Sequence, residues 1–245
     1  MEFTDIHFHG LWGVDDGPQT EQEMYQLLDS AYAEGTQVLC ITPHFHPGYF
    51  HDNQTQSERA FGKLRAYAAE RYPDMKLYLG NELRYDRGAD SWLESGMCRT
   101  INETSYVLVD FRSDEERKTI LRAVKQLMYY GYTPILAHAE RYRNLSRDLR
   151  DLRDLRNSGV VIQLDGMSML GGFGLETKFM SRKILKHGLA DIICSDAHDT
   201  GKRPPVMRKS YDYICKHFGE DYARALCCDR ALEILFENEE GKGLE

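Results

Sequence analysis

The chain has 245 residues, of which 42% are hydrophobic and 29% charged, a composition that is ordinary for a globular protein and sufficient for a full core. Its formal net charge of −8 and its pI of about 5.6 argue against a general nucleic-acid-binding protein. No apolar run reaches the roughly 20 residues needed to cross a bilayer, so we expect no membrane insertion and a cytoplasmic location.

The chain opens with a short predicted strand followed by a turn, residues 3–18. Side chains alternate in direction along an extended segment, so His7 and His9 project to the same face. Imidazole is a common ligand of divalent metals, and Asp15 and Asp16 follow in a glycine-flanked turn. The pattern indicates a mixed nitrogen and oxygen metal site, with a hydrogen-bonded histidine pair as the alternative at this point.

Strands and helices alternate along the rest of the chain. Short apolar runs predict six further strands, at residues 38–42, 76–82, 106–111, 133–138, 160–164 and 190–194. Amphipathic stretches predict helices between them. The first covers residues 20–35, and the second follows the loop with His44 and His46 and ends at about residue 72. Others are predicted at 89–94, from about 113 to 131, at about 145–156, at 178–187 and from 204 onward. A glycine-rich loop precedes the helix at 178–187.

This alternation predicts parallel βαβ units, for which the compact architectures are a closed barrel and an open doubly wound sheet. Candidate ligands follow the ends of six of the seven predicted strands, which is where parallel α/β folds place their sites. In a closed barrel those ends surround one pocket. We therefore expect an α/β protein with a seven-stranded barrel and its site at the carboxyl ends of the strands.

Each candidate ligand also has a structural alternative. Glu82 and Asp110 could cap helices or form salt bridges, and His138 could donate to a backbone carbonyl. Burying all of these groups at one barrel mouth would be costly without a cation, however. The segment Ser195–His198 repeats the spacing of the first histidine pair. About nine candidate ligands, at four to six for each ion, predict two or three metal ions.

Seven short motifs together resemble a known family: Asp5–His9, Val14–Pro18, Thr42–His44, Gly80–Glu82, Ala137–Tyr142, Ser195–His198 and Arg203–Pro205. The chain resembles the polymerase and histidinol phosphatase (PHP) superfamily. Within it, the chain is similar to the bacterial manganese-dependent protein-tyrosine phosphatases that are encoded with capsular and extracellular polysaccharide genes. The motifs cover nearly the whole chain in order, and the VDDGP, HxERY and SDxH elements, the last followed by RPP, separate this branch from other PHP proteins.

The resemblance implies a single PHP-type metallophosphatase domain over residues 1–245, built as a distorted (β/α)7 barrel. It implies two or three divalent ions, manganese first, with iron, zinc or cobalt as alternatives, held by His7, His9, Asp16, His44, Glu82, Asp110, His138, Asp196 and His198. The implied partner is a phosphotyrosyl protein, specifically an autophosphorylating bacterial tyrosine kinase. Asp110 stands where relatives usually carry the longer Glu, and His46 is left as a supporting or substrate-loop residue.

A phosphomonoester also needs groups that neutralise its charge and release its leaving oxygen. Clustered metals lower the pKa of a bound water, and Arg141 and Arg203 are suited to bidentate phosphate contacts. A salt bridge is the structural alternative for each arginine. His44, or a metal-bound water, is the candidate proton donor to the leaving phenolate. None of the six cysteines is followed six positions later by Arg, which argues against a cysteine phosphatase.

Two alternatives to a protein-tyrosine phosphatase remain at this point. One is a small-molecule phosphomonoesterase of the histidinol-phosphate type, which would share the metals but not the substrate. The other is a metal-binding regulatory protein without turnover. The VDDGP and HxERY elements favour the tyrosine phosphatase over the first, and the two arginines beside the ligands argue against the second.

Overall fold

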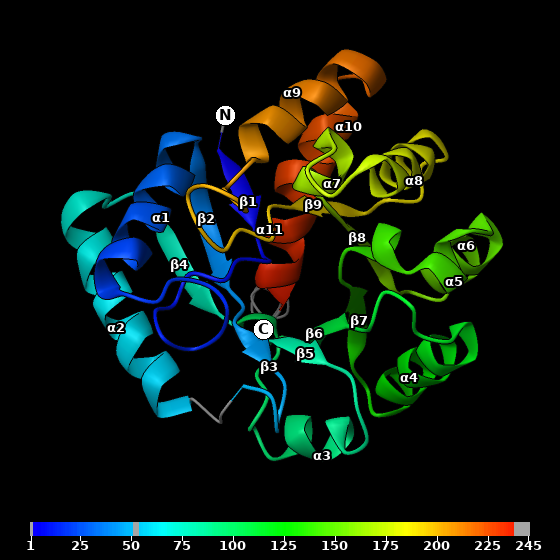
Figure 1. Ribbon diagram of the computed structural model, residues 1–245, viewed down its shortest axis with the longest axis horizontal. Coiled ribbons are helices and arrows are strands. Elements are labelled where there is room, and N and C mark those ends of the chain that lie inside the picture. The colour runs from blue at the N-terminus through cyan, green and yellow to red at the C-terminus, as the bar shows by residue number, and fades with distance from the viewer. Residues whose placement is uncertain (1, 51–53, 238–245) are drawn as a thin grey trace, which may run out of the picture.

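The computed structural model describes residues 2–50 and 54–237. In this part of the chain nine parallel strands form two sheets, in the orders β1-β2-β4 and β3-β5-β6-β7-β8-β9. The strands are β1 (Phe3–Asp5), β2 (Thr36–Ile41), β3 (His44–Phe45), β4 (Lys76–Leu79), β5 (Glu82–Arg84), β6 (Tyr106–Asp110), β7 (Thr133–Leu136), β8 (Val161–Asp165) and β9 (Ile192–Cys194). They occupy the centre of the molecule, with most helices around them (Figure 1).

Helices connect most successive strands, as the βαβ alternation predicts, and the last three α-helices of the described chain follow the last strand. The α-helices are α1 (Glu21–Ala33), α2 (Gln54–Arg71), α3 (Ala89–Glu94), α4 (Arg117–Tyr129), α5 (Arg143–Ser146), α6 (Leu149–Asn157), α7 (Gly166–Leu170), α8 (Leu175–Lys186), α9 (Met207–Phe218), α10 (Glu220–Arg224) and α11 (Arg230–Leu235). Short 3-10 segments occupy η1 (Ile101–Glu103) and η2 (Ala139–Arg141), and a π-helical turn, η3 (Ala225–Asp229), joins α10 to α11. Among the described residues, every helix is too short or too polar to span a membrane.

The strands curl into a half-barrel, and the predicted count of seven is not confirmed. The predicted strands at 38–42 and 76–82 each extend into a second short strand after a two-residue break, which separates β2 from β3 and β4 from β5. Hydrogen bonds continue across the breaks, from the Gly80 amide to the Ile41 carbonyl (2.9 Å) and from the Glu82 amide to the Pro43 carbonyl (3.0 Å). After the ends of β1 and β9, an isolated parallel bridge joins Phe8 to Ala197.

Local sequence signals account for two of the helices. A capping box precedes α1, because Thr20 and Glu23 exchange side-chain and backbone hydrogen bonds. The leucine stripe predicted over 145–156 is divided between α5 and α6. The division arises because the Asp148 carboxylate accepts from the Arg150 amide and thereby starts a new helix at Leu149.

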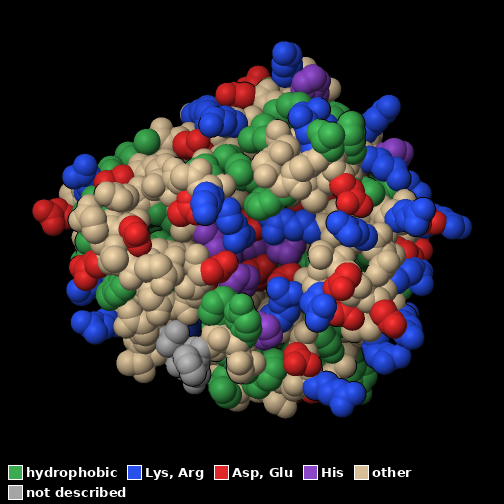
Figure 2. Space-filling view, viewed as in Figure 1, with side chains coloured by type: hydrophobic (Ala, Val, Ile, Leu, Met, Phe, Trp, Pro, Cys, Tyr) green, Lys and Arg blue, Asp and Glu red, His purple; other side chains and the backbone are tan. Residues whose placement is uncertain are grey.

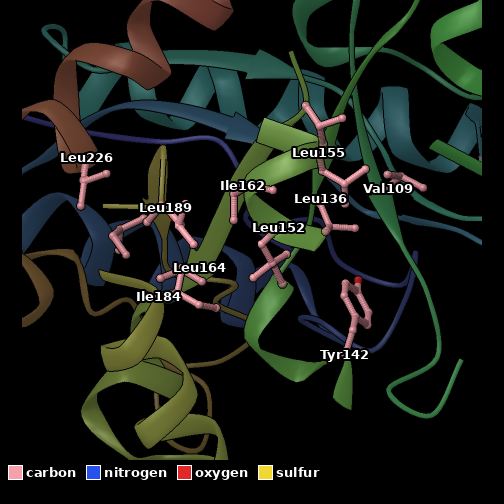
Figure 3. Close-up of a cluster of buried hydrophobic side chains, with 14 of the residues drawn as sticks. Val109, Leu136, Tyr142, Leu152, Leu155, Ile162, Leu164, Ile184, Leu189 and Leu226 are labelled. Atoms are coloured by element: carbon pink, nitrogen blue, oxygen red, sulfur yellow. The ribbon is translucent and has the colours of Figure 1, made fainter. Parts of the chain in front are cut away.

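Buried side chains form three hydrophobic clusters. The largest lies between strands β5 through β9 and the helices that cover them. Figure 3 shows part of it, including Leu152 from α6 against Leu136 and Ile162 from the sheet. A second cluster fills the space between the β1-β2-β4 sheet and helices α1 and α2. The third lies among strands of both sheets and is closed by Ile234 and Leu235 of α11. The helices thus hold the curled sheet from the outside while α11 closes one end.

We expect Leu152→Ala to destabilise the fold by about 2–5 kcal/mol, because Leu152 is fully buried and its removal leaves a cavity. The midpoint and slope of chemical denaturation would measure this loss. Leu175→Ala is the matched control, since Leu175 is 69% exposed and its truncation should change stability by less than about 0.5 kcal/mol. Equal effects of the two changes would contradict the packing described for α6.

Candidate metal centre

The carboxyl ends of the strands converge on one edge of the curled sheet. Figure 2 shows histidine and acidic side chains in a hollow near the centre of this face, bordered by basic side chains. All nine predicted ligands lie in four overlapping groups whose candidate ligand atoms are within 4.8 Å of one another: His9, Asp16, His44 and His198; His7, His9 and Glu82; His7, His138 and Asp196; and His44, Glu82 and Asp110. The structure therefore brings together every residue that the sequence proposed as a ligand.

Glu82, at the start of β5, lies between four of the histidines. Its Oε1 atom is 3.3 Å from His7 Nε2 and 3.1 Å from His138 Nε2. Its Oε2 atom is 3.3 Å from His9 Nε2 and 2.7 Å from His44 Nδ1. Because each oxygen faces two histidines, this carboxylate belongs to two of the four groups and is suited to bridge two ions.

A second part of the site lies nearer to solvent. The Asp16 Oδ1 atom is 3.2 Å from His198 Nε2 and 3.4 Å from His44 Nε2. The Asp16 side chain is 51% exposed, whereas that of Glu82 is 1% exposed. An ion held here would therefore exchange with solvent more easily than one held around Glu82.

Asp196 connects the histidines to the two predicted phosphate-binding arginines. Its Oδ1 atom is 3.3 Å from His7 Nε2 and 3.4 Å from His9 Nε2. Its Oδ2 atom accepts hydrogen bonds from Arg141 Nη2 (2.9 Å) and Arg203 Nη2 (2.8 Å). The salt-bridge alternative considered for these arginines is thus present, and it places both guanidinium groups directly beside the candidate ligands.

Unpaired polar atoms show that this donor set fits metal ions. His44 Nδ1 and Glu82 Oε2 are close, yet among the described residues neither atom has a partner with hydrogen-bond geometry, and buried His198 Nε2 has none either. The Nε2 atoms of His7 and His9 are only 3.2 Å apart. Imidazole and carboxylate groups in this proximity are typical ligands of Mn²⁺, Fe²⁺, Zn²⁺ or Co²⁺.

Burial and neighbouring charges shift the pKa values of the site's groups in different directions. Burial opposes the charge on Asp15, but contact with His9 lowers the pKa of Asp15 to about 2. Burial, and then the charge of His9, lowers the pKa of His198 to about 4, so its imidazole is neutral near pH 7. Burial, followed by repulsion from Glu82, raises the pKa of Asp110, a conflict that a cation would relieve.

Several supporting residues lie outside the predicted set of nine ligands, among them Asp15, which the opening motif suggested as part of a metal site. Gln163, a polar residue inside an apolar strand, has its Oε1 atom 3.1 Å from His7 Nδ1 and accepts from the His138 amide (2.7 Å). Asp15 has its Oδ2 atom 2.8 Å from His9 Nδ1 and accepts from the His44 amide (2.9 Å). Such partners fix the orientation of ligating imidazoles. For Gln163 the available signal was its polarity within Val160–Leu164.

Four further residues support the site. Asp5 accepts from the amides of His7 and Ser195, both at 3.2 Å, and Asp165 forms an ion pair with Arg141. Arg84 Nη2 lies 2.7 Å from Asp110 Oδ2, while the Tyr142 hydroxyl donates to Asp110 Oδ1 (3.1 Å). Asp110 is therefore held from two sides. The positions of Arg84, two residues after Glu82, and Asp165, at the end of a strand, were the signals for these roles.

His46 lies outside the four groups. Its ring stacks on Tyr49 with centroids 5.3 Å apart, and it lines a neighbouring cavity together with Asp16 and His44. The candidate ligands Glu82, Asp110 and His138 line a different cavity of about 640 Å³, which also contains Arg141 and Arg203. This cavity is large enough for a phosphoryl group.

The fold and the site together define the class: a parallel α/β protein with a candidate multinuclear metal centre, flanked by arginines, at the carboxyl edge of its strands. A model of the family described as "Capsular polysaccharide synthesis, CpsB/CapC" matches residues 3–236. The chain belongs to the CpsB/CapC family.

Named relatives agree with this assignment. The chain is 30% identical over 238 residues to "Tyrosine-protein phosphatase CpsB" of Streptococcus pneumoniae, which covers 95% of this chain and 98% of that protein. It is 32% identical over 209 residues to "Putative tyrosine-protein phosphatase CapC" of Staphylococcus aureus, covering 85% of this chain and 82% of that protein. The resemblance identified from the sequence motifs is thus confirmed.

Solved structures match the same fold. A structure described as "Crystal structures of YwqE from Bacillus subtilis and CpsB from Streptococcus pneumoniae, unique metal-dependent tyrosine phosphatases" superposes with a TM-score of 0.86 at 25% identity, over 96% of this chain and 94% of that one. An organophosphorus hydrolase mutant superposes with a TM-score of 0.63 at 12% identity, over 95% of this chain and 92% of that one, and shows likeness of fold alone.

Proposed function

We propose that this chain is a metal-dependent protein-tyrosine phosphatase. The observation that carries the proposal is the convergence of nine metal-competent side chains with Arg141 and Arg203 at one carboxyl edge. Relatives that cover nearly the whole chain are named tyrosine-protein phosphatases, and the solved relatives are described as metal-dependent. Site and relatives therefore point to the same reaction, hydrolysis of phosphotyrosine to tyrosine and phosphate.

The nine residues of the four groups would hold two or three ions, for which manganese is our proposal. When bound, such ions neutralise phosphate charge and lower the pKa of a water to make it a nucleophile at neutral pH. The protein's own part is to hold the ligands in a fixed orientation. Gln163, Asp15 and Asp5 do this through the hydrogen bonds described above.

Arg141 and Arg203 would hold the phosphoryl oxygens that face away from the ligands. Each guanidinium already donates one hydrogen bond to Asp196 Oδ2, which fixes its position. The Nε atoms of both arginines are buried without a hydrogen-bond partner in the described chain, so each retains donor capacity. A planar fork held in this way suits a tetrahedral oxyanion.

His44 is the proposed proton donor to the leaving phenolate. Its side chain is 14% exposed, and it borders the cavities on both sides of the site, including the one that contains the arginines. In the hydrolysis, the water oxygen forms a bond to phosphorus while the bond from phosphorus to the tyrosine oxygen breaks, and the phenolate takes up one proton. Phenolate is a weak base, so this proton transfer demands little of the donor.

The proposed substrate is a phosphotyrosyl protein, and more specifically an autophosphorylating tyrosine kinase that regulates capsular or extracellular polysaccharide synthesis. Membership of a capsular polysaccharide synthesis family supports this choice. We also propose that the two sheets form one distorted barrel in a single domain over residues 1–245, with seven strands when β2 with β3 and β4 with β5 are each counted as one interrupted strand. The bridge between Phe8 and Ala197 and the buried cluster shared by both sheets support that arrangement.

The test compares substrates on one metal-loaded preparation. Protein dialysed against chelator should lose turnover and regain it with Mn²⁺, with two or three ions bound per chain at full activity. Hydrolysis of a phosphotyrosyl peptide should exceed that of histidinol phosphate. Preference for histidinol phosphate would indicate the small-molecule phosphatase, and a metal-loaded protein that hydrolyses no aryl phosphate would indicate a regulator.

Replacement of Asp110 tests the most unusual ligand. We expect Asp110→Ala to lower bound metal and to reduce activity by about 10- to 100-fold, because Asp110 lies in one of the four ligand groups. Metal analysis after dialysis, beside turnover, would measure both losses. Full metal content with full turnover would show that Asp110 only pairs with Arg84.

Asp110→Glu is the companion variant. A longer carboxylate should retain its ion better during dialysis if reach is what limits Asp110. Because Arg84 and Tyr142 already contact both oxygens, the added methylene can instead overpack the pocket at a cost of about 1–3 kcal/mol. A lower denaturation midpoint with unchanged metal retention would identify that second result.

A further inference from the structure

The glycine-rich loop between α7 and α8 holds one aromatic side chain, Phe173, between two glycines in the left-handed region. Gly171 has φ of 101° and Gly174 has φ of 93°, conformations that other residues adopt only with strain. The Gly174 amide donates to the Gly171 carbonyl (3.2 Å), and the Thr177 hydroxyl donates to the Phe173 carbonyl (3.1 Å). The backbone around Phe173 is therefore closely specified.

Phe173 lies against both arginines that we assign to phosphate binding. Its ring centroid is 4.3 Å from Arg141 Cζ and 6.0 Å from Arg203 Cζ. Phe173 is nevertheless 38% exposed, so a substantial part of it remains open to a ligand. The part of the ring that the arginines leave open is therefore accessible to a group that the same arginines hold.

Two cavities meet at Arg141. One, of about 640 Å³, contains the candidate ligands and both arginines. The other, of about 730 Å³, is lined by Phe173 and Met180 together with polar residues of α5 and α8. Arg141, Arg143 and Ser113 line both cavities. A phosphoryl group held by Arg141 therefore has an adjoining, partly apolar space for the group it carries.

We propose that Phe173 selects aryl phosphates by packing its ring against the phenyl ring of phosphotyrosine. The inference rests on the proposed phosphatase function, and it assigns to this site a determinant of substrate class. The phenyl ring is joined to phosphate through one oxygen, so it must lie close to the phosphate-binding arginines. Aromatic rings pack favourably edge to face or offset, whereas the side chain of phosphoserine offers no ring.

The test measures binding of two phosphonates that cannot be hydrolysed, phenylphosphonate and methylphosphonate, to the metal-loaded protein. The wild type should prefer phenylphosphonate. Phe173→Leu should reduce that preference by about 2- to 10-fold, the range expected for one aromatic pair, while affinity for methylphosphonate stays unchanged. Phe173→Tyr should keep the preference because it keeps the ring. Phe179→Leu, at an exposed phenylalanine of α8, is the matched control and should change neither affinity.

Three results would overturn the proposal: no preference in the wild type, an unchanged preference in Phe173→Leu, or an equal loss of affinity for both phosphonates. The last result would mean that the ring only supports the arginines. Turnover of a phosphotyrosyl peptide is measured separately. A preference that depends on Phe173, in a protein without that turnover, would refute the phosphatase function and support the ring contact.

Discussion

Glu82→Gln is expected to remove more than one metal ion per chain and to reduce phosphatase activity by more than about 100-fold. Glu82 faces His7, His9, His44 and His138 and belongs to two of the four ligand groups. Glutamine keeps the shape of the side chain but lacks the charge, and its amide nitrogen cannot act as a ligand. Metal analysis of dialysed protein, with turnover of a phosphotyrosyl peptide, would measure both effects.

His198→Ala provides the comparison for this variant. His198 belongs to one ligand group, at the more exposed part of the site, so its removal should release at most one ion. Both variants should remain folded, because the hydrophobic clusters do not depend on the ligands, although the loss of bound metal will lower the melting temperature. The cluster assignment fails if Glu82→Gln retains every ion, or if metal-replete His198→Ala shows normal turnover.

Arg203→Lys is expected to reduce turnover by about 100-fold without changing metal content. Lysine keeps the positive charge but loses the planar fork, and the cost of one preorganised donor to a developing oxyanion is of this size. The Arg203 guanidinium also holds Asp196, so metal analysis is an essential part of the measurement. Loss of metal together with activity would make Arg203 a structural support for the ligand rather than a phosphate-binding residue.

Arg150→Lys is a suitable control for the arginine experiment, because Arg150 lies on the surface of α6 and pairs with Asp148. Its exchange should leave both turnover and metal content unchanged. Arg141→Lys should resemble Arg203→Lys in activity, since both guanidinium groups meet at Asp196 Oδ2. A large difference between the two arginines would show that only one of them contacts phosphate.

The clustering of the candidate ligands could be predicted from the sequence because of one regularity of parallel α/β folds. Side chains that follow the carboxyl ends of strands share an edge, so residues as distant as His7, Glu82 and Asp196 could be placed together from strand positions alone. The two-residue spacing of His7 and His9 also indicated that their side chains point to the same face. The family resemblance then proposed Asp16 rather than its neighbour Asp15 as a ligand, and this choice stays a prediction.

The supporting residues could not be predicted in the same way. Gln163 and Arg84 act through contacts with residues on other strands, and those contacts depend on register and side-chain length. The breaks after Ile41 and Leu79 were also missed, because an apolar run shows that a strand exists and says little about where its pairing shifts. Metal identity, the kinase partner and the cytoplasmic location stay predictions.

The hydrogen bonds between the segments that follow the first and the last strand have a consequence for how the enzyme becomes active in the cell. Asp5 accepts a hydrogen bond from the Ser195 amide, 190 residues further along the chain, and the Asp196 amide donates to the His7 carbonyl. Contacts this distant in sequence form late in folding, because a long loop must close first. During synthesis, a nascent chain that has not reached this segment lacks two candidate ligands, and the backbone groups of His7 and His9 lack their hydrogen-bond partners there. Dephosphorylation by this protein would therefore begin only after translation has passed His198 and the two ends have met.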